Sequence, residues 1–353
     1  MIITASSESR VDDVINEIEI MCPGLTKHRG KVLNYIGMTF DFNKEGKVKM
    51  TMEGFVQDLI EGCGDMPGTA TTPARPNLFT TPAESDSSLP DNFREGFHSI
   101  TAKLLYLSKR TRPDILTAVA FLTKRVLRPQ RNDYNKSIRT VQYVRGTQHM
   151  GITFEVFEPI HVIAYIDAFF AIHPDMKSHT GSIITLGKGA IYTKSGTQQL
   201  MTKSITEAEL IALSEASNQV LWIRNFLEHQ GHPQPPALIY QDNQSMIQLM
   251  RNGRSSSERT RHVDIRCFFL HDRITTGDID IVYLPTTDMI ADILTKPVHG
   301  ELFKKLRKEL INITPPTLTY AVGCKTEDRT HSAPTPIRTK SNPRFPYPTS
   351  KKN

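Results

Sequence analysis

Four carboxylates stand in apolar surroundings in the stretch from Gly151 to Asn312. They are Asp167, Glu209, Asp242 and Asp292. A buried carboxylate is costly unless it is paired with a cation or binds a metal ion. Carboxylate oxygens are the ligands that Mg²⁺ prefers. If the folded chain brings the four together at strand ends, the sequence predicts a site for a hard divalent cation.

The three aspartates differ in how strongly their surroundings point to such a site. Asp167 follows the apolar run 162–166 inside a predicted strand, where aspartate is disfavoured. Asp242 follows the apolar run 237–240 and opens a predicted helix, so a role as a helix N-cap is an equal alternative. Asp292 lies among core-type residues, and its alternative is a solvated position on a helix.

Two glutamates compete for the fourth position. Ser204 and Glu207 match a capping box, in which the glutamate reaches back to the backbone of Ser204. Glu209 instead has Ala212 and Leu213 on its side of the helix and leans toward an apolar face. We therefore assign Glu207 to helix initiation and Glu209 to chemistry.

The elements that must position these carboxylates follow an α/β pattern. Strand-like runs occupy residues 161–167, 181–186, 190–193, 237–240 and 280–284. Helical patterns occupy residues 205–229, 243–250 and a stretch from residue 288. Three strands followed by helices that alternate with two further strands predict a mixed five-stranded sheet with flanking helices.

Composition divides the whole chain into five predicted parts. Their bounds are 1–63, 64–96, 97–150, 151–312 and 313–353. The first part is expected to hold a helix, two strands and a second helix, at residues 11–21, 32–42, 47–52 and 53–60. The second is rich in Pro, Ser and Thr and is a linker or a surface wrap. The third is helical, and the last is a basic, Pro-rich tail that is expected to be disordered.

The basic character of the chain belongs mostly to this tail. The formal net charge is +6, and seven basic against two acidic residues lie between Thr314 and Asn353. The charge therefore does not by itself indicate that the folded body binds a polyanion. The longest apolar run is too short to span a membrane, and no secretory signal is visible. The four cysteines lie far apart, which favours neither a disulfide framework nor a zinc site.

Five short motifs occur in order in the predicted α/β part. They are Tyr165–Ala168, Ser204–Leu213, Gln241–Ser245, Arg259–Arg266 and Ala291–Lys296. Together they resemble the ribonuclease H domain of copia-type (Pseudoviridae) retrotransposon Pol polyproteins. Two earlier segments, Arg110–Ile115 and Val32–Met38, resemble the stretch just before that domain and the late palm of the reverse transcriptase. The resemblance covers about residues 1–312.

The resemblance implies a ribonuclease H-like fold, preceded by a truncated reverse-transcriptase palm remnant and a helical thumb or connection region. Matched motif by motif, the positions that carry the family's metal ligands and catalytic groups are Asp167, Glu209, Asp242 and Asp292. The implied reaction is hydrolysis of the RNA strand of an RNA–DNA hybrid with two Mg²⁺ or Mn²⁺ ions. The implied partners are the hybrid and other parts of the polyprotein. No membrane association is expected.

The sequence departs from the family at its first motif. The family usually shows Asp-Ala-Asp-Trp, whereas this chain has Asp167, Ala168, Phe169 and Phe170, so that the first acid is kept and the second is lost. We expect the two phenylalanines to pack rather than to stack on bases. Four basic residues could contact phosphates, and a solvated charged loop and helix start is an equal alternative for them. They are Arg259, Arg261, His262 and Arg266.

A polymerase site is not expected in this chain. The pair Asp12 and Asp13 follows Arg10 and Val11 instead of the family's Tyr-Val, and we expect it to help cap the amphipathic helix there. The first residues, Met1–Thr4, resemble the strand that follows the family's catalytic pair.

The leading hypothesis is thus a metal-dependent ribonuclease H from a retroelement polyprotein. The alternative is a catalytically inactive remnant that at most binds nucleic acid. An integrase-type enzyme is disfavoured, because the glutamate helix lies between the first and second aspartates. The expected location is the cytoplasm, in a virus-like particle, or the nucleus, and not the secretory route.

Overall fold

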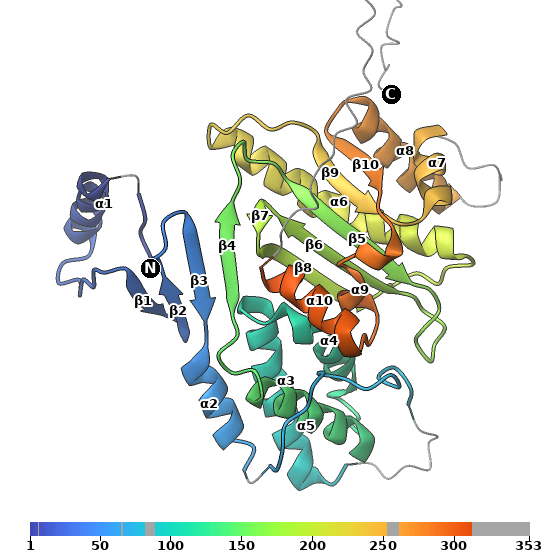
Figure 1. The fold of residues 1–353 in the computed structure, drawn as a ribbon, viewed down its shortest axis with the longest axis horizontal. Coiled ribbons are helices and arrows are strands. Elements are labelled where there is room, and N and C mark those ends of the chain that lie inside the picture. Colours follow the sequence, from blue (N-terminus) through green and yellow to red (C-terminus); the bar gives the residue numbers. More distant parts are fainter. Residues whose placement is uncertain (6, 65, 82–88, 253–260, 313–353) are drawn as a thin grey trace, which may run out of the picture. The chain divides into compact units, whose positions relative to one another are not determined.

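Two five-stranded sheets make up the β structure of the described part of the chain (Figure 1). The computed structural model describes residues 1–312 except 6, 65, 82–88 and 253–260. The tail that we predicted to be disordered, 313–353, lies outside the described residues. In the part of the chain that the structure describes, no helix is both long enough and apolar enough to cross a membrane.

The sheet that carries the predicted site has the strand order β10-β9-β5-β6-β8. Its strands are β5 (Ile163–Phe169), β6 (His179–Thr185), β8 (Ala190–Thr197), β9 (Ala237–Gln241) and β10 (Ile279–Tyr283). The first three pair antiparallel, and β9 and β10 run parallel to β5. β5, β6 and β9 are almost wholly buried, which explains their near-continuous apolar runs. The predicted mixed five-stranded sheet is confirmed.

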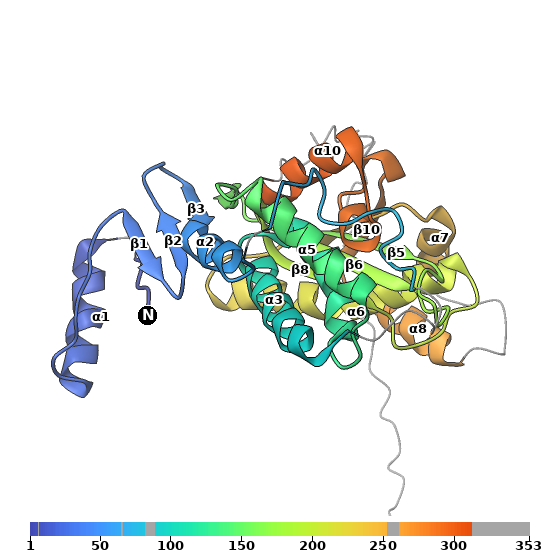
Figure 2. The same ribbon diagram turned by 90° about the horizontal axis from the view of Figure 1, so that it is seen from below.

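Helices cover both faces of this sheet. On one face lie α6 (Ile205–His229), α7 (Gln244–Asn252) and α8 (Arg261–Thr275), which share a core with Ala164 and Ile166. On the other face lie α9 (Asp292–Thr295) and α10 (Gly300–Ile311), which share a core with Tyr165. Figure 2 shows α10 on one side of β5 and β6, and α6 and α8 on the other. Because side chains alternate between the two faces of β5, they pack into two different hydrophobic cores.

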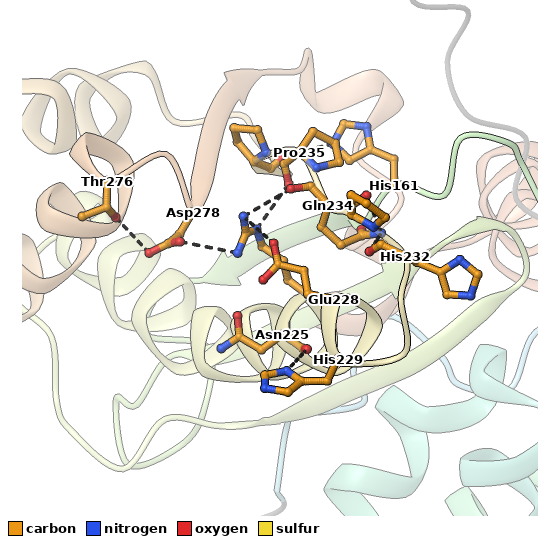
Figure 3. A network of polar contacts seen from close by, with 12 residues as sticks. His161, Asn225, Glu228, His229, His232, Gln234, Pro235, Thr276 and Asp278 are labelled. Carbon is orange, nitrogen blue, oxygen red and sulfur yellow. Dashed lines mark hydrogen bonds and ion pairs between the residues drawn. The ribbon is translucent and has the colours of Figure 1, made fainter.

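A polar network fixes the far end of α6 to the sheet (Figure 3). Arg224 on α6 donates to the carbonyls of Gln234 and Pro235, both at 3.3 Å, just before β9. The same guanidinium lies 3.5 Å from a carboxylate oxygen of Asp278, the residue before β10. Arg224 thus ties the C-terminal half of α6 to the segments that lead into β9 and β10.

The second sheet is formed by N-terminal strands together with two strands from the α/β part, in the order β1-β2-β3-β4-β7. Its strands are β1 (Val32–Tyr35), β2 (Met38–Asp41), β3 (Lys47–Thr51), β4 (Ile152–Val156) and β7 (Gly187–Lys188). β4 and β7 had not been predicted. A Cβ on Gly151 would lie 2.0 Å from the carbonyl oxygen of Met50, so only glycine lets β4 approach β3 this closely. The division of the chain at residue 150 stays a prediction.

Two predictions for the N-terminal part are wrong. The single strand expected over 32–42 is split into β1 and β2 by Ile36 and Gly37, whose φ angles are +50° and +71°. A positive φ at both positions turns the chain back on itself and makes a hairpin. Helix α1 (Glu8–Met21) begins three residues before its expected start and is capped by Ser7. Asp12 therefore lies inside the helix, where it pairs with Arg29 instead of capping.

The predicted helical part, 97–150, is helical, but its first helix begins earlier than expected. Helix α3 (Asp91–Arg110) starts inside the stretch expected to be a linker, and η1 (Pro113–Ile115), α4 (Leu116–Arg125) and α5 (Arg131–Arg145) follow it. Helix α2 (Glu53–Glu61) belongs to the first part, where a helix was expected at 53–60. The Pro-rich stretch before α3 is a surface wrap in its described portion, because Leu78 and Phe79 are buried in a core with residues of α4. We call residues 66–80 the strap.

Two further differences concern the C-terminal half. Helix α8 was predicted only as a helix start, one of two alternatives for the basic residues there, and its extent was missed. Three of its large apolar residues, Ile265, Phe268 and Phe269, are exposed, so it has no clear apolar stripe. The single terminal helix expected from residue 288 is instead the short η2 (Thr286–Asp288), α9 and α10. Pro297 follows α9 and cannot continue it.

Candidate active site

Asp167 is the best buried of the predicted acids. It lies near the end of β5 and is 1% exposed. Its Oδ2 accepts a hydrogen bond from the Oγ1 of Thr295, on α9. Its partner in the neighbouring strand β6 is Gly181. A Cβ there would lie 2.6 Å from the side chain of Thr295, so the glycine lets α9 settle against Asp167.

Glu209 comes from the start of α6 and is 3% exposed. The helix begins as predicted: Ser204 Oγ accepts from the backbone N–H of Glu207 at 3.1 Å. The Glu207 carboxylate reaches one residue further back than predicted and accepts from the backbone N–H of Lys203 at 2.7 Å. Glu207 is thus engaged at the helix start, and Glu209 points inward, where Gln241 Nε2 donates to its Oε2 at 3.0 Å.

Asp242 follows the end of β9 and is half-buried. The helix after it is capped by Asn243, whose Oδ1 accepts from the N–H of Met246 at 2.9 Å, so Asp242 is not needed as the cap. The Thr286 hydroxyl donates to Asp242 Oδ2 at 2.7 Å. Because β5 and β9 are parallel, with Tyr165 opposite Tyr240, Asp167 and Asp242 lie at the same end of the sheet.

These three carboxylates form one cluster. Asp167, Glu209 and Asp242 each offer an oxygen, and the three oxygens lie within 4.8 Å of one another. Burial, and then the charges of Asp167 and Asp242, raise the pKa of Glu209 well above its usual value. Burial also raises the pKa of Asp242, against the hydrogen bond from Thr286. Crowding of this kind is relieved by a cation or a shared proton.

Asp292 lies beside this cluster and not within it. Its Oδ1 accepts a hydrogen bond from Lys296 Nζ at 2.6 Å. Burial, followed by the charge of Asp167, raises the pKa of Asp292 to about 7, although Lys296 opposes this. The structure therefore brings three of the four predicted acids together and places the fourth next to Asp167.

Lys296 is a site residue that the sequence analysis missed, although it stands in the last motif. Its Nζ lies 3.6 Å from Asp167 Oδ2, as well as against Asp292. Burial opposes its charge, but Asp167 and Asp292 outweigh burial and raise its pKa. The chain thus supplies one of the positive charges that the carboxylates require.

Of the four basic residues predicted to contact phosphates, the structure places one. Arg266 on α8 is half-buried and its Nη1 lies 3.4 Å from Ser214 Oγ on α6. Arg259 lies outside the described residues, as do the side chains of Arg261 and His262. Their role in substrate binding stays a prediction.

The two phenylalanines that replace the family's Asp-Trp behave differently. Phe170 packs against the core beneath α6, as expected. Phe169 is partly exposed, and Lys296 Nζ lies 5.8 Å from the centre of its ring. Its ring therefore forms part of the wall of the site through a cation–π contact.

Comparison with known proteins identifies retroelement relatives. The chain is 32% identical, over 218 residues, to the retrovirus-related Pol polyprotein from transposon TNT 1-94 of Nicotiana tabacum, a match that covers 62% of this chain and 16% of the relative. It is 30% identical over 228 residues to that from transposon RE2 of Arabidopsis thaliana, which covers 64% of this chain and 15% of the relative. The chain thus spans about a sixth of the length of these relatives.

Among solved structures, LC11-RNase H1 matches with a TM-score of 0.30 and 14% identity, over 41% of this chain and 96% of that one. No family model matches the chain. The strand order and the helices on both faces confirm the predicted fold class, a ribonuclease H-like mixed sheet. The resemblance predicted from the motifs is confirmed as well: over nearly two thirds of its length, this chain is similar to copia-type retrotransposon Pol polyproteins.

Proposed function

We propose that the chain is a metal-dependent ribonuclease of the ribonuclease H type, which hydrolyses the RNA strand of RNA–DNA hybrids as part of a retrotransposon Pol polyprotein. The observation that carries the proposal is the cluster of Asp167, Glu209 and Asp242 at one end of the sheet. The similarity to Pol polyproteins supports it. We also propose an intracellular location for a polyprotein of this kind.

The donor set fits divalent metal ions of the Mg²⁺ class. Three carboxylates from β5, α6 and the end of β9 offer only oxygen ligands, and the two that are nearly fully buried are Asp167 and Glu209. We propose that these three and Asp292 hold two ions, Mg²⁺ or Mn²⁺. Such ions supply an activated water and stabilise the departing oxygen in phosphodiester hydrolysis.

The chain's own residues keep the carboxylates ready for this role. Thr295 and Thr286 donate to Asp167 and Asp242 and fix the orientation of their oxygens. Gln241 fixes Glu209, and its own Oε1 accepts from the N–H of Asp242 at 2.7 Å. One amide side chain thus sets two ligands at once. Lys296 offsets part of the negative charge until substrate and ions arrive.

The decisive experiment compares hybrid cleavage by the full chain and by Asp167→Asn, with Mg²⁺ or Mn²⁺. We expect the wild type to cut the RNA strand and Asp167→Asn to lose that activity. Asp280→Asn is the matched control, because Asp280 is an exposed aspartate on β10, the edge strand of the same sheet. A folded wild type that leaves hybrids intact contradicts the proposal.

One observation favours the alternative, a catalytically inactive remnant. Asp292 is held by Lys296 at 2.6 Å and stands outside the three-carboxylate cluster. If Lys296 stays in place when Mg²⁺ is added, a second ion has no room beside Asp292. Metal titration of the wild type in the presence of hybrid distinguishes the two, because the enzyme is expected to bind two ions and the remnant at most one.

Polymerase activity is not part of this proposal. Among the described residues, the carboxylate cluster of the β5 sheet is the single group of acids, histidines or cysteines with the spacing of a metal site. A primer-extension assay with the full chain tests this directly, and any templated extension would contradict it.

A further inference from the structure

A second polar cavity lies away from the carboxylates, between helix α5 and the strap. It has a volume of about 320 Å³. Three cationic side chains line it, Arg75 from the strap and Lys136 and Arg139 from α5. Amide side chains complete the polar lining, among them Asn77, Asn132 and Asn135. The lining contains no acidic residue.

The three cations are not neutralised by the part of the chain that the structure describes. Across these residues, none of Arg75, Lys136 and Arg139 forms an ion pair with a carboxylate. The nearest acid on α5 is Asp133, whose Oδ2 is occupied by Arg125 at 3.0 Å and by the backbone N–H of Gln130. Like charges are therefore held close together, which is costly unless an anion joins them.

The cavity is also pre-formed. Lys136 Nζ donates to the carbonyls of Leu78 and Thr80, both at 2.8 Å, which ties the strap to α5. Arg139 Nη2 donates to Thr72 Oγ1 at 3.1 Å. The Lys136 ammonium also lies 4.4 Å from the centre of the Phe121 ring. These contacts hold both cationic groups in place, and the Nε of Arg139 keeps a hydrogen bond to donate.

Arg139 is the least satisfied of the three cations. Its Nε is buried and has no hydrogen-bond partner among the described residues. Burial, and then the neighbouring charge of Arg75, lower the pKa of Arg139. Burial likewise lowers the pKa of Lys136 to about 8, helped by Arg125 and opposed by Asp133. An anion in the cavity would supply the acceptor and relieve the repulsion.

We propose that this cavity binds a phosphate group of a polynucleotide backbone. Guanidinium groups and amides match the oxygens of phosphate. The cavity has no aromatic residue in its lining on which a base could stack, so it would read the backbone and not the sequence. The inference rests on the proposed function for its ligand, the hybrid, which it would hold at a second point outside the carboxylate cluster.

The test is hybrid binding by the full chain in EDTA, which prevents cleavage, followed by fluorescence anisotropy over a range of salt. Arg75→Gln is the main variant, because Arg75 is exposed and its loss spares the fold. Arg139→Gln is the second. Arg128→Gln is the matched control, an exposed arginine that does not line the cavity.

We expect each cavity variant to weaken binding about tenfold, irrespective of sequence, because one charge-assisted contact is lost. The slope of log affinity against log salt should fall by about one, and the control should match the wild type. Equal binding by Arg75→Gln, Arg139→Gln and the wild type would overturn the proposal.

Two further measurements distinguish a polynucleotide phosphate from a small free anion, and the cavity proposal from the nuclease proposal. Pyrophosphate is titrated with and without hybrid; if it binds tightly and hybrid does not displace it, a small anion is the ligand and the polynucleotide proposal is overturned. Cleavage is measured separately. If the wild type cleaves hybrid, Asp167→Asn does not, and the cavity variants bind hybrid as tightly as the wild type, the cavity proposal alone is overturned. If the cavity variants bind hybrid more weakly but the wild type does not cleave it, the nuclease proposal alone is overturned.

Discussion

At the scale of single residues, Lys296 is the least expected part of the site. Its ammonium lies 3.6 Å from Asp167 and 2.6 Å from Asp292, where a divalent ion would also be attracted. We predict that Lys296→Gln binds Mn²⁺ roughly tenfold more tightly in the absence of nucleic acid, because a competing positive charge is removed from a poorly solvated site. Calorimetric titration of Mn²⁺ measures the change.

A matched control for this prediction is Lys304→Gln on α10, where the lysine is exposed and pairs with Glu301. Its metal affinity should equal that of the wild type. Weaker or unchanged binding in Lys296→Gln would mean that the ammonium does not compete with the ion.

Gly181 has an equally local role. A Cβ at this position would lie 2.6 Å from Thr295 Cγ2, 2.9 Å from Leu294 Cβ and 3.0 Å from the carbonyl oxygen of Ala291. We predict that Gly181→Ala pushes α9 away from Asp167 and lowers kcat by about 10- to 100-fold, since displacements near 1 Å have such effects. Single-turnover cleavage measures this. Gly196→Ala on β8, where nothing lies within 4 Å, should keep full activity.

At the scale of elements, helices and strands were predicted correctly where the local sequence pattern is compatible with a single structure. The bounds of α6 agree at both ends, because the Ser204 side chain caps the start of the helix and Gly231 follows its end. Strand β5 was predictable from its apolar run. Asp167 was predictable as a site residue because aspartate is disfavoured inside such a strand. From the sequence alone, Asp242 could be either a site residue or the N-cap of the next helix. The structure decides between the two, because Asn243 caps that helix.

The missed elements depend on contacts that are distant in sequence. β4 is a strand because β3 and β7, far away along the chain, supply its hydrogen bonds. Lys296 lies in the site because α9 packs on β6, and this packing depends on the absence of a side chain at Gly181. Neither fact leaves a periodic signal in the local sequence.

The hairpin between β5 and β6 carries two buried histidines. His173 Nε2 and His179 Nδ1 are 2.9 Å apart, and the ring of Phe79 from the strap packs against both. Burial, His173 and Lys124 lower the pKa of His179 to about 3, and burial with Lys124 lowers that of His173 to about 4. Both imidazoles are therefore neutral in the folded chain at neutral pH.

This pair predicts a loss of stability in mild acid. The unfolded histidines take up protons near pH 6.5 and the folded ones do not, so the unfolded state binds more protons between about pH 4 and 6.5. The free energy of unfolding should thus fall as pH drops, by roughly 2 kcal/mol between pH 6.5 and 5 from His179 alone. Urea unfolding at several pH values measures it, and His179→Gln should show a shallower dependence; an equal slope would refute the assignment.

At the scale of the whole molecule, a buried ionic network joins the helical part to the C-terminal helix of the α/β part. Arg112, fully buried, donates through Nε and Nη2 to the two oxygens of Asp114 at 2.9 and 2.8 Å. Tyr143 on α5 also donates to Asp114, and Arg307 on α10 lies 3.2 Å from the Tyr143 hydroxyl. Arg112 further donates to the Thr147 carbonyl at 2.9 Å, before β4 begins.

Because one network touches η1, α5 and α10, we expect these elements to unfold together. Burial alone would raise the pKa of Asp114, but Arg112 outweighs burial and lowers it, so the carboxylate is charged and paired at neutral pH. Asp114→Asn leaves the Arg112 charge buried without its partner and should lower the free energy of unfolding by roughly 3–5 kcal/mol. Asp288→Asn removes an exposed ion pair with Lys305 and should cost less than about 1 kcal/mol. Denaturant unfolding followed by far-UV circular dichroism and by tryptophan fluorescence from Trp222 tests both points: coincident transitions in the wild type are expected, and separate transitions would show that the helical and α/β parts are independent of this network.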